Sequence, residues 1–152
     1  MRIEPLSQNE VETQSSRIKE LLRQSYVVSF PNMRLEDQYF NEKVLQLSTF
    51  VAEEKAIVLG AFDPELIGFI WGYVRCFVAE RRLHINHLVV DRNYRGQGIG
   101  SMLVNSIEDY VQQKGISTID LMVSANSPAV KFYSRIGFLK ERYQMVKKLG
   151  GK

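Results

Sequence analysis

The sequence lacks the features that cross-link a small protein or attach it to a membrane. Its single cysteine, Cys76, excludes an internal disulfide and a four-thiolate metal site, and its apolar neighbours predict that it is buried. The longest nearly apolar run, residues 66–74, is far shorter than the ~20 residues of a membrane span, and no signal-peptide pattern follows Met1. These absences favour a cytoplasmic protein without a membrane partner.

An excess of charge of one sign is also lacking. The formal net charge of +3 is small and dispersed, which argues against nucleic acid as a partner. The 152 residues are 45% hydrophobic, which is enough for one core without a metal or a disulfide. We therefore expect a single domain over residues 1–149, followed by a flexible tail at residues 150–152.

Two helices are expected in the first third of the chain. Ser7 or Asn9 can cap a helix that reaches about residue 29, because Pro31 disfavours helical geometry in Phe30. A second helix is predicted over residues 34–48, after a loop at 30–33. An edge strand is predicted before both helices, at residues 2–6.

The centre of the chain has the pattern of an antiparallel meander. Strands are predicted at residues 56–62, 66–78 and 83–90, joined by short turns. The remaining elements are a helix over 99–114, a strand over 116–123, a short helix from Pro128 to about 136, and a strand or bent strand pair over 138–149. This order predicts the α+β class, with helices flanking one mixed, mostly antiparallel central sheet. The strand predicted over residues 66–78 has four aromatic side chains on one face, Phe69, Trp71, Tyr73 and Phe77. We expect them in the sheet core rather than in a ligand pocket.

A glycine-rich turn joins the third meander strand to the helix that follows it. Glycines at 96, 98 and 100 let the backbone approach an anion closely, and the first N–H groups of the helix have no carbonyl partner. Such a turn can hold a phosphate. The Lys-Ser/Thr pair of a P-loop and the spacing of a dinucleotide fingerprint are both absent. A plain strand-to-helix turn is the alternative.

Two motifs carry a resemblance to a known family. Arg95, Gly98 and Gly100 fit the pattern Arg/Gln-x-x-Gly-x-Gly/Ala, and residues 126–138 fit Asn…Ala…Phe/Tyr-Tyr…Gly-Phe. In both respects the chain resembles the GNAT superfamily of acetyl-CoA-dependent N-acetyltransferases, over nearly its whole length. The resemblance implies a sheet splayed between its fourth and fifth strands, acetyl-CoA as cosubstrate and no metal. It also implies direct acetyl transfer to a primary amine through a tetrahedral intermediate.

The resemblance assigns the cofactor-binding residues. The pantetheine arm would lie along the strand that ends at Val90, where a bulge would open a slot and an N–H near Val89 would stabilise an oxyanion. Asn126 would bind pantetheine, and the glycine turn would bind pyrophosphate. The implied cofactor-binding residues are Leu88, Val89, Val90, Arg95, Gly96, Gln97, Gly98, Ile99, Gly100, Ser101, Asn126, Ala129, Phe132 and Tyr133.

Two residues are implied to be catalytic. Tyr133 corresponds to the tyrosine that protonates the departing thiolate, and His84 to the base that deprotonates the amine, through water. Strand alternation predicts Asn86 on the same face as His84 and His87 on the opposite face. The alternatives are a core tyrosine and an ordinary strand histidine.

The resemblance leaves the acceptor and the assembly open. Polyamines, amino sugars, aminoglycosides, amino acids, peptide lysines and xenobiotic amines all fit. Glu36 with Asp37 could attract a cationic acceptor, although a solvated acidic pair is the favoured interpretation. Leu121 stands where ribosomal-protein acetyltransferases carry Glu, which argues against that subclass. A second copy could cover the open sheet edge as a homodimer. Two other classes remain, namely a non-catalytic CoA-binding regulatory module and a nucleotide-binding regulator.

Overall fold

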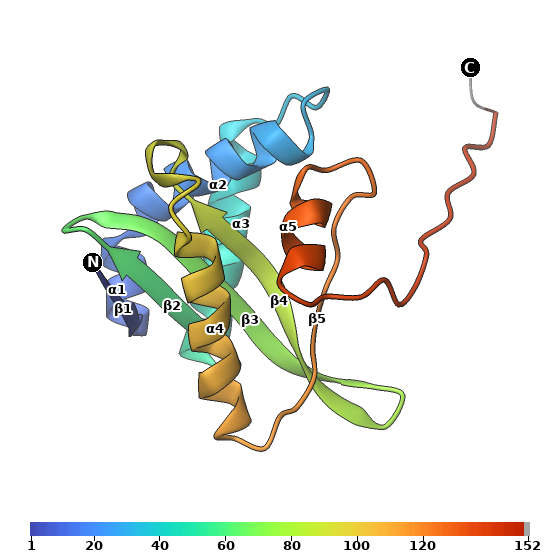
Figure 1. Cartoon of the computed structure of the whole chain (residues 1–152). Helices are drawn as coiled ribbons and strands as arrows, with labels where there is room; N and C mark the ends of the chain where they lie inside the picture. The colour runs from blue at the N-terminus through green and yellow to red at the C-terminus, as the bar shows by residue number, and fades with distance from the viewer. Residues whose placement is uncertain (151–152) are drawn as a thin grey trace.

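The computed structural model describes residues 1–150, in which one five-stranded sheet lies between two layers of helices (Figure 1). The strands follow one another across the sheet in sequence order. The elements in chain order are β1 (Arg2–Pro5), α1 (Gln8–Thr13), α2 (Ser15–Ser29), α3 (Asp37–Ala52), β2 (Ala56–Phe62), β3 (Leu66–Phe77), β4 (Glu80–Val90), a 3₁₀ turn (Arg92–Tyr94), α4 (Ile99–Gln112), β5 (Ile119–Leu121) and α5 (Ala129–Arg135).

The sheet has the expected mixed topology. Strands β1 to β4 pair antiparallel in succession, and β5 joins the edge of β4 in parallel. The parallel pair requires a crossover, which α4 supplies. The predicted α+β class and the antiparallel meander are therefore confirmed.

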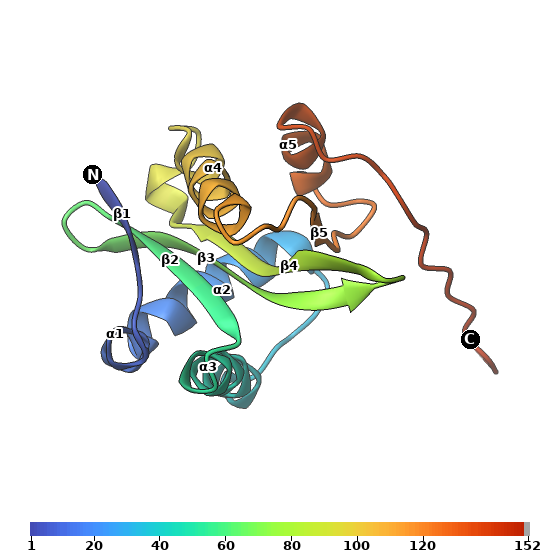
Figure 2. The same ribbon diagram turned by 90° about the horizontal axis from the view of Figure 1, so that it is seen from below.

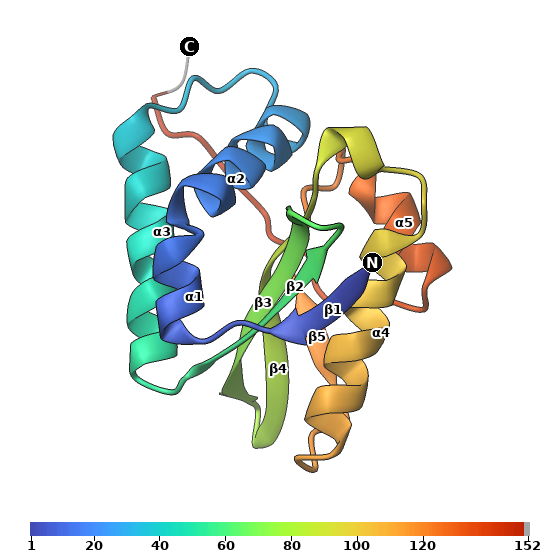
Figure 3. The same ribbon diagram turned by 90° about the vertical axis from the view of Figure 1, so that its left-hand side faces the viewer.

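Each face of the sheet has its own core. On one face, α1, α2 and α3 pack against Phe69 and Trp71, which confirms that this part of the aromatic stripe is sheet core. On the other face, α4 places Leu103 and Ile107 against Ile70. Figures 2 and 3 show the two layers, with α1–α3 on one side of the sheet and α4 and α5 on the other.

A β-bulge interrupts the regular alternation of β4. Gly72 pairs with Ile85 and the adjacent Trp71 pairs with His87, so Asn86 is an extra residue in β4. The extra residue reverses the side-chain parity beyond it. Ile85 accordingly belongs to the α4 core, whereas Val89 belongs to the core under α1–α3. The prediction that His87 faces away from His84 was wrong, because strict alternation does not hold across a bulge.

The sheet opens between β4 and β5. Their pairing covers only three residue pairs and ends at Ile85 and Leu121, whereas β4 continues to Val90. The predicted splay between the fourth and fifth strands is therefore confirmed. Beyond Ile85, the β5-facing edge of β4 has no strand partner within residues 1–150.

The two helices near the N-terminus have different bounds from those predicted. The predicted helix to residue 29 breaks at Gln14, whose ψ of 8° is not helical, and this gives α1 and α2. Ser7 and Glu10 cap α1 reciprocally, as the sequence allowed. The second helix begins at Asp37 rather than residue 34 and continues to Ala52.

The C-terminal strand predicted over residues 138–149 is wrong. Residues 139–150 form no strand, and Figures 1 and 2 show them leaving the body of the molecule. Their apolar side chains are exposed, Leu139 at 92% and Met145 at 91%. The sequence alternates as a strand does, but alternation makes a strand only where a neighbouring strand supplies hydrogen bonds. Gly151 and Lys152 of the expected tail lie outside the described residues.

Two smaller predictions also fail. Cys76 is exposed, because it lies near the tip of the β3–β4 hairpin, which extends beyond both helical layers (Figure 1). The strand predicted over 116–123 is only three residues long, since its partner β4 bulges at Asn86. Among residues 1–150, no helix combines the length and the apolar character needed to cross a bilayer.

Candidate active site

A cavity of about 820 Å³ lies where β4 and β5 part. It is lined by residues of α2 and α3 from one face of the sheet, and by residues of α4 and α5 from the other. It also includes Asn86 to Val90 of β4 and residues 122–124 beyond β5. The cavity therefore passes through the opening in the sheet and has two different ends.

The glycine turn forms the first end of the cavity. Gly96 and Gly98 have φ of 79° and 80°, the left-handed region that favours glycine, and Gly98 caps the N-terminus of α4. The helix runs for 14 residues from Ile99, so its first N–H groups and positive dipole end face this turn. This end of the cavity suits a diphosphate.

An ion pair and hydrogen bonds to the buried carboxylate of Asp91 tie the start of the turn to α2. Asp91 accepts a hydrogen bond from the Asn93 N–H at 2.8 Å and from Arg17 of α2 at 2.8 Å. Burial alone would raise the pKa of Asp91, but hydrogen bonds from Asn93, Arg17 and Gln24 outweigh it and hold that pKa below its usual value. Arg95 donates to the Val90 carbonyl at 3.1 Å instead of pairing with Asp91.

Gly100 lets α5 approach α4 closely. A Cβ at Gly100 would lie 3.2 Å from Cζ of Phe132, tighter than ordinary van der Waals contact. The next residue on α5, Tyr133, also lines the cavity and packs edge-on against Phe138 at a centroid distance of 5.5 Å. Burial raises the pKa of Tyr133 to about 12, so its phenol stays protonated at neutral pH.

A hydrogen-bonded aromatic network forms the second end. The Trp71 indole N–H donates to Nδ1 of His87 at 2.9 Å, and Nε2 of His87 lies 3.2 Å from the Tyr26 hydroxyl. Tyr39 in turn donates to Tyr26 at 3.3 Å. Burial, and then the positive charge of Lys43, lower the pKa of His87 from 6.5 to about 4. His87 is therefore a neutral imidazole, and each of its ring nitrogens has a hydrogen-bond partner.

Sequence reasoning misses this network. Strict alternation puts His87 on the wrong face, because the pattern of a strand does not locate a bulge, and Tyr26 lies in a helix that carries no motif. The bulge that the resemblance implies lies near Val89, beyond His87, and so does not change the predicted side of His87, whereas the structure places the bulge at Asn86. Of this network, Tyr26 and His87 line the cavity.

His84 lies outside the cavity lining. Its Nδ1 is 2.7 Å from an Asp120 carboxylate oxygen, and its ring packs edge-on against Tyr73. Burial would raise the pKa of Asp120, but His84 and Arg75 outweigh it and lower that pKa overall. The base assignment of His84 stays a prediction, and this hydrogen bond to Asp120 favours a structural role.

Most of the residues expected to bind the cofactor come together around the cavity. Gln97 and Asn126 do not line it, whereas the others do, namely Leu88, Val89, Val90, Arg95, Gly96, Gly98, Ile99, Gly100, Ser101, Ala129, Phe132 and Tyr133. Their binding roles are still predictions. Within residues 1–150, no group of three or more His, Cys, Asp or Glu side chains is placed to hold a metal.

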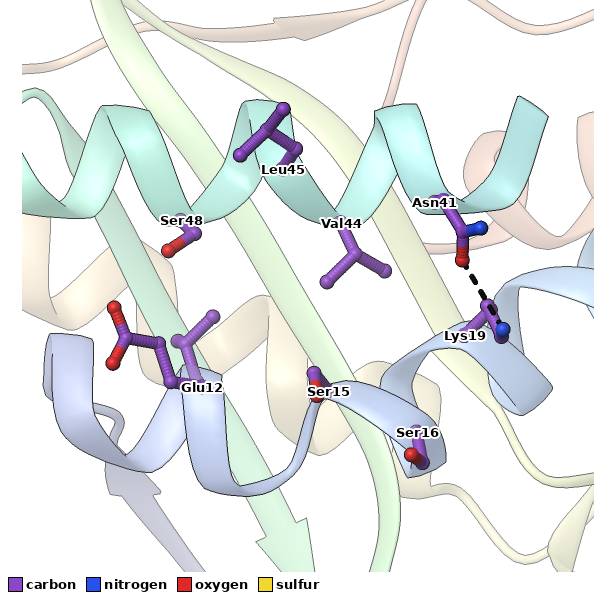
Figure 4. A pocket seen from close by; sticks show the side chains of 9 residues that line it. Glu12, Ser15, Ser16, Lys19, Asn41, Val44, Leu45 and Ser48 are labelled. Atoms are coloured by element: carbon purple, nitrogen blue, oxygen red, sulfur yellow. Dashed lines mark hydrogen bonds between the residues drawn. The ribbon is translucent and has the colours of Figure 1, made fainter. Parts of the chain in front are cut away.

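A second hollow, of about 350 Å³, lies between α1, α2 and α3 (Figure 4). None of the expected site residues lines it. Its polar side chains include Lys19 and Asn41, which bond to each other at 3.1 Å. It lies on the outer side of the helical layer, away from the glycine turn, and we assign it no role.

The fold and the cavity define a class of α+β protein whose largest described hollow lies in an opening of a mixed sheet. Residues 16–138 match the model of the acetyltransferase (GNAT) family. This span is most of the chain, so the protein belongs to the GNAT acetyltransferase family. The resemblance that the two motifs predicted is confirmed.

Individual relatives agree with this membership. An N-acetyltransferase of Methanocaldococcus jannaschii, described as uncharacterized, is 33% identical over 96 residues, which cover 58% of this chain and 42% of the relative. The human N-acetyltransferase 8B is 37% identical over 62 residues, or 40% of this chain and 27% of its own length. The matched residues thus span less than half of the length of each relative, so the match does not extend to the activity of the whole relative.

Solved structures match the fold along its whole length. A Pyrococcus furiosus protein described as a candidate acetyl transferase has a TM-score of 0.76 and 25% identity, with 97% of this chain and 99% of that chain covered. The BH1408 protein of Bacillus halodurans, solved as a tetramutant, has a TM-score of 0.80 at 21% identity, with 98% and 100% covered. The second likeness supports the fold alone.

Proposed function

We propose that this protein is an N-acetyltransferase that transfers the acetyl group of acetyl-CoA directly to a primary amine. The observation that carries the proposal is the cavity that crosses the sheet. It joins a phosphate-binding turn on one face to an aromatic pocket on the other, along an open strand edge. A long, bent ligand with a diphosphate at one end suits this arrangement.

The residues of the first end fit coenzyme A. The turn from Arg95 to Ser101 would hold the diphosphate, mainly through backbone N–H groups, and Arg135 adds a second positive charge. The unpaired edge of β4 from Asn86 to Val90 would accept the amide-bearing arm as a further strand. Acetyl-CoA supplies an activated acyl group when it is bound.

The same edge can stabilise charge during acyl transfer. An N–H of β4 near Val89 would donate to the carbonyl oxygen as it gains negative charge. The reaction forms an amide C–N bond and breaks a thioester C–S bond. The amine loses one proton, and the departing sulfur gains one.

Tyr133 would act on the departing sulfur. Its pKa of about 12 lies well above the ~8.5 of a typical thiol, so complete proton transfer from Tyr133 is uphill. We propose that its hydroxyl donates a hydrogen bond that stabilises the thiolate, which solvent then protonates. Burial is the one cause of its raised pKa, and no protein group among residues 1–150 competes for this hydroxyl.

The second end would receive the amine without a side-chain base. Both ring nitrogens of His87 are engaged, and His84 lies away from the cavity. The positive charge of Lys43 disfavours an ammonium ion near it and so lowers the pKa of a bound amine. The amine would therefore bind after it loses its proton to solvent.

Release of free thiol from acetyl-CoA tests the proposal. With a competent amine, Tyr133→Phe should lower kcat by about 10- to 100-fold while CoA binding is kept. CoA and acetyl-CoA should raise the melting temperature, and ATP and NAD should not. Stabilisation by CoA without amine-dependent thiol release would favour the non-catalytic CoA-binding module.

A further inference from the structure

All the charged side chains that line the main cavity are positive. They are Lys43, Arg95 and Arg135, and no Asp or Glu of residues 1–150 lines it. Arg95 and Arg135 belong to the end formed by the glycine turn and α5, where the phosphates of coenzyme A would account for them. Lys43 projects from α3, on the opposite face of the sheet, so those phosphates do not account for it.

Lys43 carries a charge that the protein does not neutralise. No carboxylate in the described part of the chain lies within ion-pair distance of its Nζ, which sits 5.2 Å from the Tyr39 ring centroid. Tyr39 donates a hydrogen bond to Tyr26 at 3.3 Å, so this position over Tyr39 brings the charge of Lys43 next to the aromatic network.

Nearby acidic residues are occupied elsewhere. Asp37 pairs with Lys19 and Arg23 on the outer surface of α2, and Glu42 accepts from Gln38. The expectation that Glu36 and Asp37 could attract a cationic acceptor therefore finds no support in the cavity, which neither residue lines.

We propose that the acceptor is a primary amine that also carries an anionic group, a carboxylate or a phosphate, and that Lys43 binds this group. This inference rests on the proposed function. A cation in a partly desolvated aromatic wall gains from an anionic ligand, and it repels polycations such as polyamines and aminoglycosides. Ser25, Ser29 and Asn86 also line this end and can supply neutral hydrogen bonds.

Pairs of acceptors that differ in the anionic group measure the effect of that group on the rate of acetylation. Thiol release from acetyl-CoA is measured with each common amino acid against its carboxamide, and with O-phosphoethanolamine against ethanolamine. Spermidine and kanamycin are included as polycationic acceptors. We expect kcat/KM to be at least about 10-fold higher for the anionic member of the preferred pair, with the difference mainly in KM.

Substitution of Lys43 assigns the preference to this residue. Lys43→Met removes the charge while keeping most of the length of the side chain, and it should bring the preference close to 1 through a loss of rate for the anionic amine. Lys43→Arg should keep most of the preference. Lys55→Met is the matched control, because Lys55 pairs with Glu53 outside the cavity and should leave the preference as it is.

The outcomes separate the two proposals. If amines are acetylated but the neutral or cationic members are preferred, the charge inference is overturned and the proposed function stands. If the anionic preference survives Lys43→Met, the assignment to Lys43 is overturned. If CoA binds and no amine of the panel is acetylated, the proposed function fails, and this inference fails with it.

Discussion

The indole N–H of Trp71 donates to Nδ1 of His87 at 2.9 Å, and this contact fixes the state of the imidazole. Nδ1 is an acceptor, so in the neutral ring the proton lies on Nε2, which faces Tyr26 at 3.2 Å. Protonation of His87 would bring two N–H groups face to face. The aromatic wall of the cavity therefore depends on an uncharged histidine.

Stability should depend on this histidine below neutral pH. The pKa of His87 is about 4 in the folded protein, against 6.5 for an unperturbed histidine. Between these values the unfolded chain binds a proton that the folded chain does not, so the free energy of unfolding falls as pH falls. The contribution is about 1.4 kcal/mol per pH unit within this window.

Urea unfolding at pH 7 and pH 5 measures the effect. His87→Gln cannot titrate, so its loss of stability from pH 7 to pH 5 should be smaller than that of the natural protein. An equal pH dependence in both proteins would show that His87 is not held neutral by the fold.

Two glycines of the turn should respond differently to alanine. Gly98 has a φ of 80°, so Gly98→Ala strains the backbone and should cost about 1–2 kcal/mol of stability. Gly100 has ordinary helical geometry, and the tight contact that a Cβ would make there is with Phe132, at 3.2 Å. Gly100→Ala should therefore change stability little and weaken CoA binding, by displacing Phe132 in the cavity wall.

Thermal unfolding and CoA titration distinguish the two effects. Because the Gly100 contact is with a side chain, adding Phe132→Leu should restore part of the CoA affinity that Gly100→Ala loses. The prediction does not survive if Gly98→Ala is as stable as the natural protein, or if the double variant binds no better than Gly100→Ala.

His84 should prove to be structural. Its bond with Asp120 at 2.7 Å joins β4 to β5 next to the last paired residues before the sheet opens. His84→Asn should lower stability by about 1–3 kcal/mol, because it leaves a partly buried carboxylate without that partner. The pH profile of kcat/KM should keep its shape, rising toward the pKa of the free amine. A lost or shifted acidic limb in His84→Asn would instead identify His84 as the base.

Truncation tests the C-terminal segment. Met145 and Leu149 are 91% and 84% exposed, and residues 145–150 form no strand. Deleting residues 145–152 should shift the melting temperature by less than about 2 °C, whereas deleting from residue 139 also removes the Arg82–Glu141 ion pair. A large loss of stability in the shorter deletion would mean that this segment is paired in solution.

Much of this arrangement follows from local signals in the sequence. Three β-rich runs with short turns dictate a meander, since adjacent strands pair wherever a turn brings them together. Gly96 and Gly98 adopt the left-handed backbone geometry that other residues avoid. The turn that they form places the N-terminus of α4 shortly after the end of β4. Most of the residues that the two motifs single out, in the turn and in α5, accordingly meet around one cavity.

What only the tertiary structure decided depends on contacts between distant segments. The bulge at Asn86 reverses the parity of β4, because the register is set by pairing with β3, and it turns His87 toward the face of His84. Burial against Trp71, 16 residues away, then makes that histidine neutral. The strand-like alternation of residues 139–150 gave no strand, since a pattern cannot supply the partner that its hydrogen bonds need.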